Sequence, residues 1–321
     1  MMSLQESAKN SGLIKKTVNE DMNSKKKNSK ALKRDIPFIV LVAPFTVFFV
    51  IFTVIPIISA LALSLTDYNL LQINHFVGLK NYTRLLLDDS VFLIAFKNTM
   101  IQALITGPIG FILSFVIAWL INELGRTTRS IVTLIVYSPA LAGNIFFIWQ
   151  YIFSSDSRGF INNFLMQLGV IKDPIYWLTD EKYNFIIVMI VSIWMGFGTG
   201  FLSFVAGFKS LDKSFFEAAA VDGLKNRWQE LYYVTFPQMG PQLMFGAVMS
   251  ISSAFAVGAV NQSLTGFPSS NYSTHTILLH MTDYANNRFE MGYASAIAVV
   301  LFVLMILFKA VVNKVLSKFG G

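Results

Sequence analysis

The stretch IPFIVLVAPFTVFFVIFTVIPIISALALSLT, residues 36–66, contains no charged residue and consists mostly of Ile, Val, Leu, Phe and Ala. A helix needs only ~20 such residues to cross the hydrocarbon of a bilayer. The rest of the chain is similar in character, because 54% of its 321 residues are hydrophobic and only 13% are charged. The sequence therefore predicts an all-α integral membrane protein. A membrane β-barrel would show short alternating segments instead.

Six apolar segments are long enough to cross a bilayer, and they are predicted at about 36–66, 91–121, 130–153, 184–208, 239–262 and 291–312. Lys97 and, near the end of the last segment, Lys309 are the only charged residues within them. We therefore expect a transmembrane domain over 36–316. The basic tail 1–35 is polar and poor in aromatic residues, so we expect it to be disordered. A contact of this tail with membrane lipid is a weaker alternative to a simple stop-transfer flank.

The distribution of positive charge predicts the orientation of these spans. With the N-terminus inside, the cytoplasmic segments 1–35, 122–130, 209–238 and 309–321 carry 18 of the 25 Lys and Arg residues. The opposite loops carry the other 7, whereas Asp and Glu divide equally between the two sides. Cytoplasmic loops of membrane proteins carry such an excess of cations. We predict that both termini are cytoplasmic, and that the net charge of +7 reflects topology and not nucleic-acid binding.

The sequence lacks the motifs of several kinds of catalytic, metal-binding and nucleotide-binding site. Cysteine is absent, and His75, His275 and His280 form no H-x-x-x-H or H-E-x-x-H pair. No G-x-x-x-x-G-K-[ST] stretch is present to bind ATP, and no acid, base and nucleophile group together. We therefore predict no catalysis, metal or cofactor in this chain.

The alternatives from other classes are a carrier driven by an ion gradient and a membrane enzyme or channel subunit. A carrier of that kind would need Asp or Glu within the membrane for ion coupling. The six predicted spans contain neither residue.

Between the fourth and fifth predicted spans lies the polar stretch EAAAVDGLKNRWQELYYVTFP, residues 217–237. Ser214 with Glu217 has the spacing of a capping box, which predicts a helix that begins near Phe215. Gly223 can adopt the left-handed conformation that ends such a helix. Asn226, with Gln229 three residues later, predicts a second helix from Arg227 to about Val234 that ends before Pro237.

The second helix also carries bulky side chains at helical spacing. We expect some of them to pack on the membrane ends of neighbouring spans and to make the insert rigid; they are Trp228, Leu231, Tyr232 and Phe236. An ordinary long connection that happens to contain helix is the alternative.

This insert resembles the EAA signature of bacterial ATP-binding-cassette importer permeases, at positions Glu217, Ala218, Ala219, Asp222, Gly223, Phe236 and Pro237. In that family the spacing from glycine to proline is usually one residue shorter, and a leucine usually stands in place of Phe236. The longer form resembles a subgroup of carbohydrate permeases. The likeness continues in FVGLKNYTRLLLD (76–88) and SPALAGNIFFIWQYIFSSDSRGFINNFL (138–165), and it extends to Gram-positive permeases for rhamnogalacturonan and related plant oligosaccharides.

The resemblance implies a type I importer fold in the bacterial cell membrane, whose insert over 209–238 docks on a cytoplasmic ATPase. It implies a second homologous permease, two ATPase subunits that carry ATP and Mg, an extracellular solute-binding protein and an oligosaccharide substrate. A permease for a non-sugar solute is the nearest alternative. The implied ATPase-coupling residues are Glu217, Ala218, Ala219, Ala220, Asp222, Gly223, Arg227 and Pro237.

Candidates for the sugar path come from polar and aromatic residues in the spans, since polar groups at membrane depth are costly unless they face water or a partner. They are Asn98, Gln102, Asn144, Trp149, Gln150, Tyr151, Trp194, Ser253, Asn261 and Gln262. The same residue types also tie helices together, and for any single residue we favour that structural role.

Overall fold

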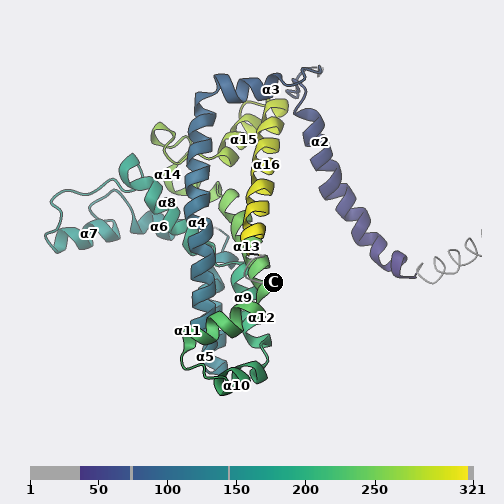
Figure 1. Ribbon diagram of the computed structural model, residues 1–321. Helices are drawn as coiled ribbons and strands as arrows, with labels where there is room; N and C mark the ends of the chain where they lie inside the picture. Colours follow the sequence, from purple (N-terminus) through teal and green to yellow (C-terminus); the bar gives the residue numbers. More distant parts are fainter. Residues whose placement is uncertain (1–36, 73–74, 144, 317–321) are drawn as a thin grey trace, which may run out of the picture. The chain divides into compact units, whose positions relative to one another are not determined.

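The computed structural model describes residues 37–72, 75–143 and 145–316, so the predicted disordered tail 1–35 lies outside it. The described part of the chain is helical and forms no strand, apart from an isolated bridge between Thr66 and Phe76. It divides into two units, one ending at Ser59 and one beginning at Ala60. Figure 1 shows the helices of the second unit arranged along the long helix α4 (Ser90–Asn122).

The first described helix runs from Pro37 to Leu63 and includes a π-helical turn, η1 (Val50–Val54), followed by α2 (Ile55–Leu63). None of its side chains in η1 or α2 is buried. An exposed helix that is apolar all round fits lipid or another apolar surface and does not fit water.

In the described part of the chain, three helices can cross a membrane alone: Pro37–Leu63, α4, and Met291–Val315 within α16 (Met291–Leu316). Three further crossings are pairs of helices joined at a break, which gives six when each pair counts as one. The pairs are α5 (Arg126–Leu141) with α6 (Phe146–Ile152), α8 (Glu181–Met195) with α9 (Thr199–Ser210), and α13 (Gly240–Phe255) with α14 (Ala259–Thr265).

These breaks differ from the continuous spans expected at 130–153, 184–208 and 239–262. The α8–α9 pair bends by 42° and the α13–α14 pair by 41°. Gly196 and Gly198 lie in the first of these breaks and Gly258 in the second. Glycine tolerates such irregular backbone, but the apolar composition continues across each break, so hydropathy alone does not detect it.

The connecting helices are short. They are α3 (Lys80–Thr83), η2 (Arg84–Asp88), α7 (Phe160–Gln167), α10 (Lys213–Val221), α11 (Arg227–Glu230), η3 (Leu231–Thr235), α12 (Phe236–Gln238), η4 (Ser270–Tyr272) and α15 (Ile277–Asn286).

One part of the core is an aromatic cluster where α4 packs against α9 and α13. The fully buried Phe204 ring meets Phe111 and Phe115 edge to face, at centroid distances of 5.4 and 5.5 Å. Gly246 of α13 makes room for this ring, since a Cβ there would lie 2.2 Å from Phe204 Cζ. Helices in membranes commonly approach one another at such small residues.

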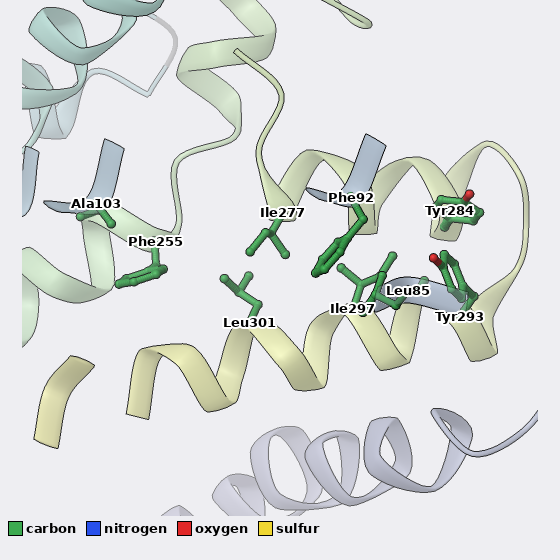
Figure 2. Packing of buried hydrophobic residues seen from close by; sticks show 11 residues of the cluster. Leu85, Phe92, Ala103, Phe255, Ile277, Tyr284, Tyr293, Ile297 and Leu301 are labelled. Carbon is green, nitrogen blue, oxygen red and sulfur yellow. The ribbon is translucent and has the colours of Figure 1, made fainter. Parts of the chain in front are cut away.

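Another part of the core lies where η2 and the start of α4 meet α15 and α16 (Figure 2). Ile297 and Leu301 of α16 face Phe92 and Ile277 in this view, and the rings of Tyr284 and Tyr293 lie 4.5 Å apart.

A buried polar network tightens this end of the molecule around Asp89, which caps α4 by accepting a 2.9 Å hydrogen bond from the Phe92 amide. Its other oxygen accepts from the Tyr293 hydroxyl at 2.8 Å and lies 2.9 Å from His280 Nε2. His280 Nδ1 in turn lies 3.2 Å from His275 Nε2. Burial acts to raise the pKa of Asp89, but the hydrogen bonds from His280, Phe92 and Tyr293 outweigh it and hold that pKa well below its usual range.

Replacing Gly246 by alanine should lower the free energy of unfolding of the protein in detergent by about 1–3 kcal/mol, and with it the melting temperature. The added methyl group overlaps the buried Phe204 ring. Gly110→Ala is the matched control, since a Cβ there meets nothing within 4 Å and alanine favours helix. Equal melting temperatures for the two variants would contradict this account of the crossing.

The stability of the protein should also fall between about pH 6.5 and about pH 4. Burial, together with the nearby His280, lowers the pKa of His275 to about 4. The unfolded chain, with a histidine pKa of about 6.5, therefore binds this proton at a higher pH than the folded chain does. The free energy of unfolding therefore decreases by up to about 3 kcal/mol as the pH falls from about 6.5 to about 4. Asp89, whose pKa is depressed, loses its own contribution below about pH 4.

Thermal unfolding of wild type and His275→Gln at several pH values measures this effect. The variant cannot take up a proton at this position, so its melting temperature should fall less steeply with decreasing pH. Parallel curves for the two proteins would refute the assignment to His275.

Candidate functional site

The insert between α9 and α13 forms two helical segments joined by a tight turn. The first, α10, begins two residues earlier than a Ser214 cap would allow, because Asp212 caps it and accepts a 3.0 Å hydrogen bond from the Ser214 amide. The predicted capping box at Ser214 is therefore wrong. Asp212 is an equally good cap by residue type, and its carboxylate also favours the positive end of a helix.

Gly223 ends α10 as predicted, with a φ of +95°. The Leu224 amide donates to the Ala219 carbonyl at 3.0 Å, and the Gly223 amide donates to the Ala220 carbonyl at 3.2 Å. These two bonds define a Schellman motif, which requires a left-handed residue at this position. A residue with a Cβ would be strained here.

Asn226 caps the second segment as predicted. Its side chain accepts a 2.9 Å hydrogen bond from the Gln229 amide, and the Gln229 side chain accepts one from the Lys225 amide at the same distance. The prediction that this helix ends before Pro237 is wrong, because helical turns continue from α11 through η3 and α12 to Gln238. Pro237 lies in the first turn of α12, where a proline is tolerated because the amide there needs no helical partner.

The predicted coupling residues fall on both faces of the insert. Ala219 is buried, so it packs inward. Glu217, Ala218, Ala220, Asp222, Gly223, Arg227 and Pro237 are exposed. Sequence reasoning missed Val221, which is 88% exposed and lies one turn after Glu217 on the outer face of α10. An exposed apolar side chain next to the exposed Ala218 and Ala220 gives this face a surface suited to another protein.

The three breaks in the bent crossings meet at one pocket of about 380 Å³. It is lined by Pro139, Ala140, Gly143, Ser192, Met195, Gly196, Gly198, Thr199, Ser253, Ala256, Val257, Gly258, Ala259 and Val260. A smaller recess of about 30 Å³ shares Ser192 and Ser253 with it and reaches Thr106 of α4.

This pocket is uncharged, and its polar groups are hydroxyls and the main chain of the breaks. Non-helical backbone at membrane depth is tolerated where it lines a cavity that supplies other partners for its amides and carbonyls. The arrangement therefore suits a neutral, hydroxyl-rich solute.

Among the predicted path residues that the structure describes, only Ser253 lines the pocket. Trp149 and Trp194 lie near one another, with rings edge to face at 5.2 Å, and Gln150 donates a hydrogen bond to the Ser263 carbonyl. Tyr151 and Gln262 are exposed, and Asn144 lies outside the described residues. The sequence analysis missed Ser192 and Thr199 as pocket residues. The glycines of the nearby stretch GFGTG, residues 196–200, were the sequence feature that could have pointed to a break there.

Three predicted path residues are buried and bound internally. Gln102 and Asn261 exchange two amide hydrogen bonds of 3.1 and 3.3 Å, and Gln102 also donates to Ser192. Asn98 donates to the carbonyls of Tyr272 and His275, at 3.0 Å each. These side chains tie α4 to α8, α14 and the loop before α15, and they do not line the pocket.

The described residues contain no group of three His, Cys, Asp or Glu side chains that could hold a metal ion.

Known proteins resemble the chain over most of its length. The Probable ABC transporter permease protein YesP of Bacillus subtilis is 31% identical over 293 residues, which cover 88% of this chain and 93% of that protein. The Arabinooligosaccharides transport system permease protein AraP of the same organism is 27% identical and covers 90% of this chain and 91% of its own.

The solved structure of a bacterial ABC transporter involved in the import of the acidic polysaccharide alginate matches with a TM-score of 0.74 at 24% identity. It covers 91% of this chain and 99% of its own, and it shows that the helices adopt the type I importer arrangement.

A family model described as Binding-protein-dependent transport system inner membrane component matches residues 107–319, from the middle of α4 past the end of α16. The match includes the whole insert and the breaks that form the pocket. This chain therefore belongs to the family of binding-protein-dependent transport system inner membrane components, the membrane permease subunits of ATP-binding-cassette transporters.

Proposed function

We propose that this chain forms half of the membrane path of an importer for neutral oligosaccharides. The observation that carries the proposal is the uncharged pocket where three broken helices meet, with the hydroxyls of Ser192, Thr199 and Ser253 on its walls. Its volume of about 380 Å³ suits a short stretch of a sugar chain. Relatives named for arabinooligosaccharides, lactose and starch degradation products support this class of substrate.

A rhamnogalacturonan fragment is the finer hypothesis, and the pocket gives it no direct support. Such fragments contain galacturonate, and the pocket lining has no cation to bind a carboxylate. If an acidic sugar is imported, the partner permease must supply the charge.

In the proposed complex, a second homologous permease completes the path and two cytoplasmic ATPase subunits hold ATP and Mg. An extracellular binding protein delivers the sugar. Both termini of this chain then lie in the cytoplasm, on the same side as the insert. The exposed outer face of α10, with Glu217, Ala218 and Val221, docks on an ATPase, and ATP-driven closure moves this contact.

Uptake into vesicles that contain the whole complex tests the proposal. Vanadate should block import of labelled neutral oligosaccharides, and dissipating ion gradients should leave it intact. Import that survives vanadate and stops with the gradient would show a gradient-driven carrier instead. Vanadate-sensitive import of a non-sugar solute alone would keep the transporter class and overturn the substrate.

Gly223→Pro should abolish ATPase recruitment and import while leaving membrane insertion intact, because proline cannot adopt a φ of +95°. Gly169→Pro is the matched control. Gly169 ends α7 with a φ of +70°. The Gly169 amide donates a hydrogen bond to the Met166 carbonyl and the Val170 amide donates one to the Leu165 carbonyl, so a Schellman motif closes there too. Co-purification of the ATPase measures the effect, and equal loss in both variants would reject a specific role for the insert.

Gln102→Leu should destabilise the protein by about 1–3 kcal/mol, because the buried Asn261 Oδ1 loses its hydrogen-bond donor, whereas Asn261 Nδ2 keeps the Thr274 carbonyl. Adding Asn261→Leu should recover part of that loss, since the unpaired group is removed as well. Thermal unfolding and import are measured together. If the double variant regained stability but lost sugar uptake, these amides would be substrate ligands and not ties between helices.

A further inference from the structure

Three contacts connect the last turns of α4 to the second segment of the insert. Phe115 stacks on Phe236 with ring centroids 5.2 Å apart at 16°, and Trp119 contacts Trp228 at 5.2 Å. Glu123, which follows the last residue of α4, accepts a hydrogen bond from Arg227 and forms an ion pair with it. We call these three pairs the α4 ladder.

The spacing of the α4 ladder places its members on one face of the helix. Phe115, Trp119 and Glu123 follow one another at intervals of four residues, which is about one helical turn. Their partners run in the opposite direction along the chain. The ladder passes from the buried Phe115 to the exposed Trp228 and to an ion pair whose side chains are 42% and 61% exposed.

The ladder changes the role expected for Arg227. The resemblance assigns Arg227 to ATPase coupling, but its guanidinium is directed to Glu123 and lies 4.0 Å from Glu230. Trp228 likewise covers Trp119. These side chains orient the insert on α4, whereas the exposed residues of α10 remain available for a partner.

The same helix reaches the pocket. Thr106 and Gly110 of α4 line the recess next to it, and Gln102 is hydrogen bonded to Ser192 and Asn261. The insert is covalently continuous with α9 and α13 only. The α4 ladder is thus a noncovalent connection from the insert to a third span that contributes to the pocket wall.

We propose that the α4 ladder transmits movement of the insert to α4 and to the pocket, with Glu123 and Arg227 as positioning residues. This inference rests on the proposed function. An exposed ion pair contributes only about 0–1 kcal/mol to stability, so its loss hardly affects folding. It fixes the orientation of the insert relative to α4, and its loss therefore affects coupling more than stability.

Charge reversal in the complete complex, reconstituted with its ATPase and binding protein, tests this role. Glu123→Arg and Arg227→Glu should each lower the number of sugars imported per ATP hydrolysed several-fold, while ATPase recruitment and melting temperature stay near wild type. The double variant, which reverses the pair, should restore the ratio. Lys225→Glu is the control, since it reverses an exposed charge on the insert outside the ladder.

Two outcomes would overturn the inference: single variants that keep the wild-type ratio, or a double variant that does not recover. A failure of the proposed function would look different, because wild type itself would then show no vanadate-sensitive import and no bound ATPase.

Because the sequence contains no cysteine, a second test can ask whether the insert and α4 move together. Glu123→Cys with Arg227→Cys should show the lowered ratio, because the ion pair is gone. A short thiol crosslinker should restore import if the insert and α4 move together. Import that is blocked by the crosslink would show that the two must separate, and it would refute transmission through the ladder.

Discussion

The constraint on which this structure depends is that amides and carbonyls within a bilayer must find partners inside the protein. Continuous helices satisfy this demand by themselves, as α16 does. The breaks after Met195 and Phe255 do not satisfy it, so their free main-chain groups must face a cavity. The pocket lies where the breaks of three crossings meet, and hydroxyls together with the main chain of the breaks supply its polar groups.

The breaks in these crossings show which parts of the fold can be predicted from the sequence and which cannot. Long apolar runs predict the crossings, since hydropathy depends on composition alone. The same composition continues through Gly196-Phe197-Gly198, so the run predicts a span where the structure has two helices at 42°. A glycine in an apolar run signals either close packing, as at Gly246, or a break, as at Gly258. Only the neighbouring helices decide between these outcomes.

The candidate site likewise combines features that local sequence determines with features that depend on tertiary contacts. The ends of the insert helices depend on local chemistry, and the roles of Gly223 and Asn226 were therefore predictable from a few residues. Asp212 was missed because two good caps stand close together and the sequence does not rank them. For the path, buried amides looked like sugar ligands, yet Gln102 and Asn261 bind each other. Pairing between residues so distant in sequence is a tertiary property, as are the contacts of Arg227 with Glu123.

The two ends of α4 are held in different ways, and this difference bears on motion. At one end Asp89, His280 and Tyr293 form a buried network whose disruption leaves an unpaired charge, which is costly. At the other end the outermost contact is an exposed ion pair of small energy. Regions with few buried contacts open and shift more readily than the core. We therefore expect α4 to stay fixed near Asp89 and to move near Glu123, so that a displacement of the insert tilts the helix and reshapes the recess at Thr106 and Gly110.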